Sequence, residues 1–463
     1  MKTKISALLF VSLLGTCALS ACQSGGGGGG GGSSKSKDVI TIAIVSDFSE
    51  SNTMNTFIKA YKEQPGHENQ KFKVVKMTNY HDYVFNSFLY DELADIVQVF
   101  DISCGYYTNG DLDGAGTSLL QSLTPLMKRD GIKESDFFES ILDMTKCKVG
   151  SDDMYWFPRD YNKVVCAYNK KMFDIAEVPY PTDSWTWADL IDTCNALKAK
   201  EAAIKKYSGS ATFFPIDLNM DFEAVYYPIL KSYGGELIDA KSRTCFGPNE
   251  SDIQLARDAW GKLLNLADTK LANAPGGAQI PFTNKQAAMM FMVRPNLPTY
   301  VNSLGKDTID FVSLPLYEDL ATGQTSYIGM GCSGYGMTTA CPEDKKDMVW
   351  DFLKFIVSVD GQNAFSRAGS GIPCLKALAS DPNAEFKKYL VTDEYHPNHN
   401  AFVAYPERDI TANFLGKFEI EKQLTLEKYV KDRTLHTFYT KTGDARDKYY
   451  NEYKTNMEKI WAK

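Results

Sequence analysis

The sequence is poor in histidine, in paired cysteine motifs and in positive charge, and each shortage excludes a class of function. Only five histidines occur in 463 residues, and the ten cysteines include no CxxC pair, so no zinc site is indicated. Aspartate and glutamate number 58 against 50 lysines and arginines, which gives a formal net charge of -8. An acidic surface argues against nucleic acid and anionic lipid as binding partners.

Long apolar runs are also absent, with one exception at the N-terminus. Beyond residue 22 no segment approaches eighteen consecutive apolar residues, so we expect no membrane-spanning helix there. Lys2 and Lys4 precede an almost uninterrupted apolar run over residues 5–18. This is the anatomy of an export signal, and the run is too short to span a bilayer comfortably.

The signal ends in LSAC, residues 19–22, which resembles the bacterial lipobox. In a lipobox the cysteine is acylated, as by palmitate, and becomes the mature N-terminus, which implies an anchor at Cys22 in which each buried CH₂ contributes roughly 0.8 kcal/mol. The alternative is an ordinary cysteine near a simple secretory cleavage site. Residues 23–37 are rich in Gly and Ser and predict a flexible tether with a reach on the order of 20 Å. We therefore expect an exported protein anchored to the outer face of a bacterial cytoplasmic membrane.

The first part of the mature chain predicts an α/β fold. β-branched apolar runs alternate with segments of helical periodicity, and this alternation implies a parallel, doubly wound sheet. Ser51 is in position to cap the first helix. In such sheets ligands bind beyond the carboxyl ends of the strands, where Asp47, Phe48 and Asp101 lie. The expected strands are 39–45, 72–77 and 95–100, and the expected helices are 51–61 and 83–90.

The strand and helix pattern restarts after residue 153. Thr186 followed by Asp189 resembles a capping box at the start of a helix. About 425 residues remain after the signal and tether, which is more than one hydrophobic core usually serves, so we expect two halves joined by short ordered crossovers. The further expected elements are strands at 163–168, 288–293 and 310–314 and helices at 252–267 and 347–359.

A series of short matches in a fixed order runs from about residue 39 to residue 378. They are Pro158, Tyr168, Asn169, Lys170, Pro181, Trp187, Ala188, Asp189 and Leu190; Gly234 and Gly235; Phe282, Lys285, Ala288 and Met289; Leu314 and Pro315; Trp350, Phe352 and Phe355; and Gly371, Ile372 and Pro373. In this order the chain resembles the sugar-binding extracellular solute-binding proteins (family 1) that serve ABC importers. It departs from them at 294–296, where the family often places Gly or Trp, and after Ala379 nothing aligns.

The resemblance implies a two-lobed, type II periplasmic-binding-protein-like fold that closes over its ligand about a hinge. Lobe 1 would comprise 38–160 plus 331–375, and lobe 2 would comprise 161–330 plus 376–463. The crossovers would fall near 159–162 and 327–331. The implied protein is a receptor without enzymatic activity, cofactor or metal, and a monomer. Its partners would be a carbohydrate, the permease subunits of an ABC importer, and the membrane through its lipid.

A carbohydrate site needs polar groups at the rim of the sugar ring and aromatic rings on its faces. The candidate residues lie beside the expected crossovers and at the expected strand ends. Their structural alternatives are an ion pair between Arg159 and Asp160, helix capping by Asp47 and Asp101, and core packing of the aromatic rings; Trp187 and Trp350 are assigned to the core. The candidate ligand-binding residues are Asp47, Phe48, Asp101, Tyr106, Trp156, Arg159, Asp160, Asp221, Phe222, Arg294 and Tyr335.

Three motifs are set aside. GMGCSG, residues 329–334, satisfies G-x-G-x-x-G but leads into a strand-like run, so no helix N-terminus is available for a pyrophosphate. The HxxH pair of His396 and His399 is interrupted by a proline and predicts a surface loop. Asn109, Asp111 and Asp113 have the spacing of a calcium loop, but Leu120 stands where the bidentate glutamate belongs, which favours a polar turn. The eight cysteines after residue 22 are expected to be mostly buried free thiols.

The sequence predicts a receptor that captures a carbohydrate, an oligosaccharide rather than a monosaccharide, outside the cell. A surface glycoside hydrolase is the rival from another class, because Asp47, Asp101 and Asp160 are available as a carboxylate pair. A receptor for peptides or another polar solute is the third reading, because Arg294 is able to pair with a carboxylate.

Overall fold

The computed structural model of the protein describes residues 37–109, 117–220, 222–235, 249–273 and 282–411, with the short pieces 238–239 and 244–245 and single positions between 448 and 459. The predicted signal, Cys22 and most of the tether lie outside the described residues. No helix among the described residues has the length and apolar character needed to cross a membrane.

The first sheet has five strands in the order β2-β1-β3-β13-β4. β1, β2 and β3 are parallel, as the alternating pattern predicts, whereas β13 runs antiparallel to β3 and pairs on its other edge with β4. The sheet is therefore mixed, because β13 arrives from the second half of the chain. The strands are β1 (Val39–Val45), β2 (Lys71–Met77), β3 (Ile96–Phe100), β4 (Phe157–Pro158) and β13 (Ser333–Met337).

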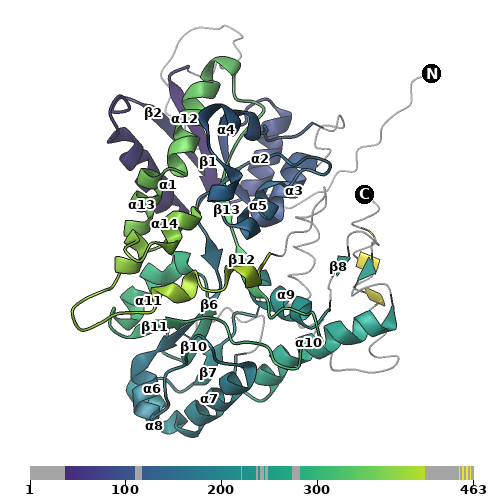
Figure 1. Cartoon of the computed structure of the whole chain (residues 1–463), viewed down its shortest axis with the longest axis vertical. Coiled ribbons are helices and arrows are strands. Elements are labelled where there is room, and N and C mark those ends of the chain that lie inside the picture. The colour runs from purple at the N-terminus through teal and green to yellow at the C-terminus, as the bar shows by residue number, and fades with distance from the viewer. Residues whose placement is uncertain are drawn as a thin grey trace, which may run out of the picture. The chain divides into compact units, whose positions relative to one another are not determined.

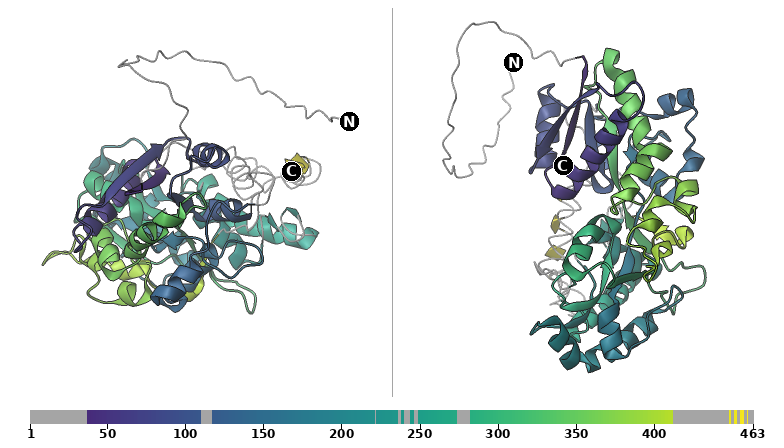
Figure 2. Two further views of the ribbon diagram at one scale, coloured as in Figure 1. Left: turned by 90° about the horizontal axis from the view of Figure 1, so that it is seen from above. Right: turned by 90° about the vertical axis from the view of Figure 1, so that its left-hand side faces the viewer.

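Helices cover both faces of this sheet. The strand order reverses its direction at β2, so right-handed crossovers must put α1 and α2 on opposite faces, and Figures 1 and 2 show α1, α12 and α13 on the side away from α2 and α3. The helices around this sheet are α1 (Phe48–Lys62), α2 (Tyr80–Leu89), α3 (Asp101–Asn109), α4 (Thr124–Asp130), α5 (Glu139–Thr145), α12 (Lys346–Ile356) and α13 (Val359–Arg367), with the 3₁₀ turns η1 (Glu134–Asp136) and η3 (Glu343–Lys345).

One predicted helix start is wrong. The cap of α1 is Asp47 rather than Ser51, because the Asp47 carboxylate accepts a hydrogen bond from the Glu50 N–H at 2.7 Å. Only two residues therefore separate the end of β1 from the helix, whose first residue is Phe48. This early start places Asp47 and Phe48 directly at the carboxyl end of β1.

The second sheet has four strands in the order β11-β6-β10-β7. β10 is parallel to β7, and β6 is antiparallel to both of its neighbours. Thr186 and Asp189 form the predicted capping box of α7, and Asn249 with Asp252 forms another at α10. The elements are β6 (Val165–Asn169), β7 (Phe214–Asp217), β10 (Ala287–Met292), β11 (Ile309–Val312), α6 (Lys170–Ala176), α7 (Trp187–Ala199), α8 (Glu201–Ser208), α9 (Glu223–Ser232), α10 (Glu250–Asp268), η2 (Arg294–Asn296) and α11 (Leu297–Leu304), with a separate hairpin of β8 (Ile238–Asp239) and β9 (Thr244–Cys245).

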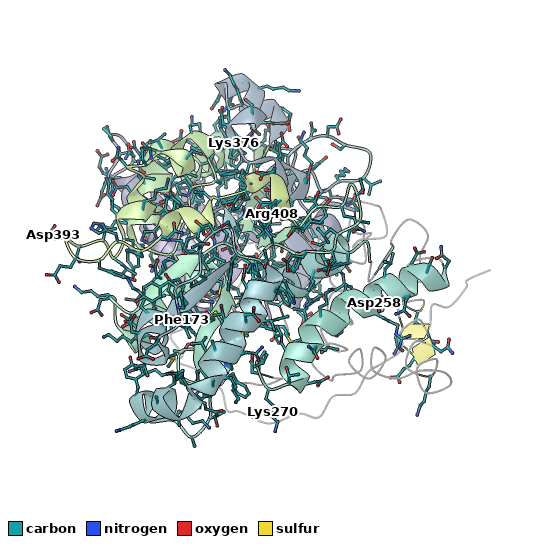
Figure 3. All side chains as sticks on the ribbon, turned by 60° about the horizontal axis from the view of Figure 1, so that its bottom comes forward. Phe173, Asp258, Lys270, Lys376, Asp393 and Arg408 are labelled. Atoms are coloured by element: carbon teal, nitrogen blue, oxygen red, sulfur yellow. The ribbon has the colours of Figure 1, made fainter. Side chains whose placement is uncertain are left out.

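Side chains fill the space between these elements and the helices around them. Phe173 is fully buried in the core beside the second sheet, and Asp258 lies exposed on α10 (Figure 3). Trp187 and Trp350 are buried, as predicted. Among the residues that the structure describes, seven cysteines are buried thiols without a disulfide, as predicted: Cys104, Cys147, Cys166, Cys194, Cys332, Cys341 and Cys374.

A third, small sheet joins the segments that cross between the two larger ones. It has the order β14-β12-β5, with β5 (Asn162–Lys163), β12 (Ile328–Gly331) and β14 (Asp409–Ile410). Both predicted crossovers thus contribute a strand, and β14 is a third segment that the sequence did not reveal. The chain reaches β14 through α14 (Lys376–Ser380) and the 3₁₀ turns η4 (Glu385–Lys388), η5 (His399–Phe402) and η6 (Pro406–Arg408).

A buried ion pair fastens β14 to β5. The Lys163 ammonium lies 2.6 Å from the Asp409 carboxylate, and both side chains are at most 1% exposed. The Tyr161 hydroxyl donates a hydrogen bond to the same carboxylate, and Ser140 Oγ lies 3.4 Å from it. Burial raises the pKa of Asp409 to about 6 although Lys163 opposes this shift. The pair therefore links the crossing strands to α5.

The glycine-rich motif at 329–334 serves backbone packing. Its residues form β12 and β13 rather than a phosphate loop, which confirms that no helix follows. A Cβ on Gly329 would overlap the Ala224 carbonyl of α9, and one on Gly334 would overlap the Phe157 carbonyl of β4. The crossing strand and α9 approach this closely only because position 329 has no side chain.

We expect Gly329→Ala to reduce the free energy of unfolding by about 1–3 kcal/mol, since the new methyl group must displace backbone rather than a flexible side chain. The matched control is Gly261→Ala in α10, where a Cβ meets no atom within 4 Å. That change should raise stability by about 0.5–1 kcal/mol, the propensity difference between alanine and glycine in a helix. Urea titrations of both variants test this, and equal effects would show that β12 is not tightly packed.

Candidate functional site

A pocket of about 390 Å³ opens between the end of β1, the end of β3, the first crossing segment and the η2–α11 turn. Its size falls in the range of small-molecule sites. Residues of the first sheet's side line one wall, and residues that follow β10 of the second sheet line the other. The lining residues are Asp47, Phe48, Ser49, Glu50, Gln98, Phe100, Arg159, Pro295, Asn296 and Thr299.

The first wall is positioned by the ends of two parallel strands. Phe48, the first residue of α1, is 83% exposed, so its ring is available to a ligand. Gln98 stands in the middle of the apolar strand β3 and is 1% exposed. Its side-chain oxygen accepts a hydrogen bond from the Val45 N–H at 2.9 Å, which fixes the end of β1 against β3.

A buried ionic network forms the floor. The Arg159 guanidinium pairs with Glu50, which is 2% exposed, and its Nε lies 3.6 Å from the Asp160 carboxylate. The Tyr335 hydroxyl donates a hydrogen bond to the other Glu50 oxygen. Burial raises the pKa of Asp160 to about 6, although Arg159 opposes this shift. The nearby acidic groups, Asp160 foremost, raise the pKa of Arg159 despite its burial, so the guanidinium stays charged.

Asp47 is the carboxylate at the mouth of the pocket. It is exposed, and desolvation raises its pKa while Arg159 opposes this shift. Its carboxylate accepts the hydrogen bond from the Glu50 N–H that caps α1, as the structural alternative for this residue predicts. Asp47 also lines the pocket.

Arg294 is not in the pocket, which corrects its prediction as a ligand-facing cation. It is fully buried, its guanidinium bonds to His399 Nδ1 at 3.0 Å and to the Phe386 carbonyl at 2.8 Å, and the rings of Phe386 and Phe402 lie 5.3 Å and 5.0 Å from it. Burial lowers its pKa to about 9. The next residues of the same turn, Pro295 and Asn296, do line the pocket.

His399 also departs from its prediction. It was expected in a surface loop, but it is 3% exposed, and burial and the adjacent Arg294 lower its pKa to about 3. His396 is exposed as predicted. No group of three metal-ligating side chains occurs among the residues the structure describes, and Asp111 and Asp113 of the calcium-loop candidate lie outside them. The Asn109 amide is used within the fold, where it donates to the Cys147 carbonyl and accepts from the Val149 N–H.

Two predicted aromatic residues are core residues. Trp156 is fully buried, and its indole N–H donates to the Met144 carbonyl at 3.3 Å. Tyr335 is also fully buried and reaches the site only through its hydrogen bond to Glu50. Neither side chain lines the pocket.

Asp101, Phe222 and Tyr106 do not line the pocket. A Cβ on Gly331 would lie 3.3 Å from Asp101 Oδ2 and 3.8 Å from Phe222 Cζ, so these two side chains approach the crossing strand together. Asp101 also accepts a hydrogen bond from the Cys332 N–H at 3.2 Å. The ring of the partly buried Tyr106 packs on Phe85. Asp221 lies outside the described residues.

Several lining residues escaped the sequence reasoning. Gln98 could have been identified, because a polar side chain in the middle of a buried strand is unusual without a specific role. The indication for Glu50 is weaker: it lies three residues after the helix cap, in the first turn of α1. The others, which come from turns or strand ends without a distinguishing pattern, are Ser49, Phe100, Pro295, Asn296 and Thr299.

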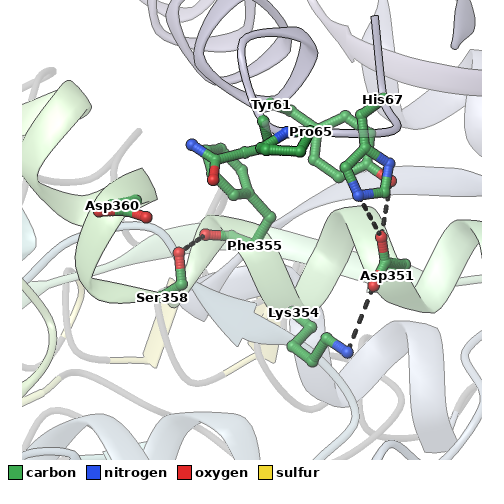
Figure 4. Close-up of a pocket in the computed structure, with 9 residues that line it drawn as sticks. Tyr61, Pro65, His67, Asp351, Lys354, Phe355, Ser358 and Asp360 are labelled. Atoms are coloured by element: carbon green, nitrogen blue, oxygen red, sulfur yellow. Dashed lines mark hydrogen bonds and ion pairs between the residues drawn. The ribbon is translucent and has the colours of Figure 1, made fainter.

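A second pocket of about 380 Å³ lies where α1 meets α12 and α13 (Figure 4). Its charged groups already satisfy one another: Asp351 accepts a hydrogen bond from the Tyr61 hydroxyl at 2.8 Å and lies 3.4 Å from His67 and 3.3 Å from Lys354. All of its walls belong to elements around the first sheet. It is therefore a weaker candidate than the pocket that both halves of the chain build.

The family model of bacterial extracellular solute-binding proteins matches residues 106–391, which is more than half of the chain. The chain belongs to this family. The match includes the crossing strands β5 and β12 and the second wall of the pocket. It ends within the C-terminal segment, before β14. Comparison with curated protein sequences gives no match.

Solved structures with the same two-lobed α/β fold confirm the predicted fold class. An ABC substrate-binding protein from Listeria monocytogenes in complex with cycloalternan has a TM-score of 0.66 at 18% identity, over 92% of this chain and 99% of that one. Maltose-bound MalE3 of T. maritima has a TM-score of 0.67 at 15% identity, over 91% and 99%. UgpB from Mycobacterium tuberculosis in complex with glycerophosphocholine has 0.66 at 14% identity, over 93% and 99%.

The buried Asp160 predicts a pH dependence of stability. Its pKa is about 6 in the folded protein and about 3.9 in an unfolded chain. Between these pH values the folded protein holds a proton that the unfolded chain releases. The contribution of Asp160 to the free energy of unfolding therefore falls as the pH rises from 4 to 7. Relative to Asp160→Asn, the free energy of unfolding of the wild-type protein should increase by up to about 2–3 kcal/mol when the pH is lowered from 7 to 4.

Urea unfolding of the wild type and of Asp160→Asn at several pH values measures this difference. Asp393→Asn is the control, because it removes an exposed carboxyl in place of a buried one. A difference between wild type and Asp160→Asn that is constant across this pH range would contradict the raised pKa.

Proposed function

We propose that this solute-binding protein is the lipid-anchored receptor of an ABC importer and captures a carbohydrate, in particular an oligosaccharide, outside the cell for delivery to the permease. The observation that carries the proposal is the make-up of the pocket. An exposed ring, Phe48, stands beside the planar polar groups of Asp47, Gln98 and Asn296. Sugars present C–H groups on their faces and hydroxyls at their edge, and these groups match rings and planar polar groups respectively.

The position of the pocket supports capture by closure. Asp47 and Phe48 belong to the first sheet's side, and Asn296 and Thr299 follow the second sheet, with the three short crossing strands between them. A solute that contacts both walls binds more tightly when they approach, so binding selects the closed arrangement. The proposed ligand-binding set is therefore Asp47, Phe48, Gln98, Arg159, Asn296 and Thr299, with Asp101 and Phe222 beside the crossing strand.

The solved structures of similar fold support the class of solute. Two of them hold cycloalternan and maltose, both carbohydrates, and one holds glycerophosphocholine. At 14 to 18% identity these ligands do not transfer to this chain by themselves. They make a carbohydrate the first solute to test and a polar phosphodiester the second.

Two rival functions find less support. A glycoside hydrolase requires two carboxylates that flank one bond, but Glu50 and Asp160 are buried against Arg159, which leaves Asp47 as the carboxylate at the pocket mouth. A peptide receptor was suggested by Arg294 as a partner for a carboxylate, and that guanidinium is enclosed by His399 and the Phe386 carbonyl.

A thermal-shift screen of the chain from Asp38 onward tests the proposed ligand class, because a ligand of the folded state alone raises the melting temperature. Oligosaccharides, monosaccharides, peptides and glycerophosphocholine form the panel. A rise with glycans and no product by chromatography is the expected result. Product formation would favour the hydrolase, and a rise with peptides alone would overturn the carbohydrate proposal.

Phe48→Ala should weaken binding of the glycan found in that screen roughly three- to tenfold, which corresponds to the 0.5–1.5 kcal/mol of a ring contact. Its melting temperature should not change, because Phe48 is 83% exposed. Tyr90→Ala is the control: Tyr90 is 75% exposed and does not line the pocket. Equal glycan affinities of the two variants, measured by calorimetry, would remove Phe48 from the site.

The lipid anchor predicts that cells expressing the full chain incorporate labelled palmitate into it and retain it in the membrane fraction. Cys22→Ser should abolish the label and release the protein, since no acyl chain remains to be buried. Cys104→Ser removes a buried thiol instead and should leave the label in place. Membrane retention of Cys22→Ser without label would show that another segment holds the protein.

A further inference from the structure

The charges around the pocket do not balance. Asp47, Glu50 and Asp160 supply three carboxylates, and Arg159 is the single cation among the described residues that line the pocket or form its floor. Glu50 and Asp160 are 2% and 1% exposed and both face Arg159, so the guanidinium is already neutralised from inside the protein. The guanidinium therefore offers little positive charge to a solute, and the charge that a solute meets is the carboxylate of Asp47.

The start of α1 does not reverse this balance. A helix N-terminus usually attracts anions through its free N–H groups. Here the Asp47 carboxylate accepts from the Glu50 N–H at 2.7 Å, so the protein's own anion occupies that position. An anionic solute would meet Asp47 first, and the two like charges would repel each other.

The aromatic ring beside Asp47 fits the same conclusion. Phe48 is 83% exposed, and Phe100 also lines the pocket. The face of an aromatic ring attracts cations as well as the C–H groups of sugars. A carboxylate next to an exposed ring is thus a pair of groups that recognises an ammonium group.

We propose that the solute carries a positive charge, and that its class is an amino sugar, an oligosaccharide with free amino groups. This inference rests on the proposed carbohydrate function for its sugar part, whereas its charge part rests on the pocket alone. The ammonium group lies against Asp47 and Phe48, and the remaining hydroxyls meet Gln98 and Asn296. Closure then places the solute's charge where it balances the excess of carboxylates.

Calorimetry with a matched series tests the charge and the sugar separately. Glucosamine oligomers and N-acetylglucosamine oligomers of equal length share rings and linkage and differ in charge. Galacturonate oligomers supply a negative charge, and choline supplies an ammonium group without a sugar. In buffer near neutral pH, where Asp160 is ionised, we expect the glucosamine oligomer to bind at least tenfold more tightly than its acetylated counterpart and the galacturonate oligomer not to bind.

Asp47→Asn isolates the responsible group. Asparagine caps helices as well as aspartate does, so this variant removes the charge and keeps the cap. The ratio of the affinities for the amino and the acetylated oligomer should fall at least tenfold. Asp393→Asn removes an exposed charge that does not line the pocket and should leave the ratio unchanged.

Each outcome separates the two proposals. Equal or tighter binding of the acetylated or the galacturonate oligomer would overturn the charge inference and leave the carbohydrate proposal standing. Binding of choline alone would keep the positive charge and overturn the carbohydrate. An unchanged affinity ratio in Asp47→Asn would also overturn the inference, and silence from all four probes would overturn both.

Discussion

The contact on which the rest of the site depends is the pairing of Arg159 with Glu50. It joins the first turn of α1 to the segment that leaves the first sheet, and Tyr335 of β13 completes it through a hydrogen bond to Glu50. The backbone of Arg159 is held as well, because its N–H donates to the Ser333 carbonyl and its carbonyl accepts from Gln362. Removal of one member of such a buried pair usually costs about 3–5 kcal/mol, since the other charge is left without a partner.

This arrangement connects the floor of the pocket directly to the crossing strands. Two residues after Asp160 the chain enters β5, where Lys163 is paired with Asp409 of β14. The ionic groups behind the ligand and those between the crossing strands are thus separated by a few residues of one extended segment. A change in the position of Arg159 would therefore act directly on the strands that cross between the two halves.

The outline of this fold was accessible to sequence reasoning because it depends on local patterns. Continuous β-branched runs became β1 and β3, and the Thr186 and Asp189 pair became a capping box. The distant contacts were not accessible. Apolar periodicity shows that Trp156 or Tyr335 is near a core, but it does not show that both are fully buried and outside the pocket lining. No local sequence pattern indicates that Arg294 is enclosed by residues about a hundred positions later in the chain.

The two walls of the pocket are held in different ways, and this difference bears on selectivity. The first wall follows from parallel strands and a helix cap, which any chain with this sheet can reproduce. Pro295 and Asn296 follow Arg294, and the position of Arg294 is set by His399 and the Phe386 carbonyl in the C-terminal segment. The family match ends at residue 391, between these two partners. Sequence changes in that segment would therefore move the second wall without touching a lining residue, which makes the segment the part of the chain most able to retune the pocket for a different solute.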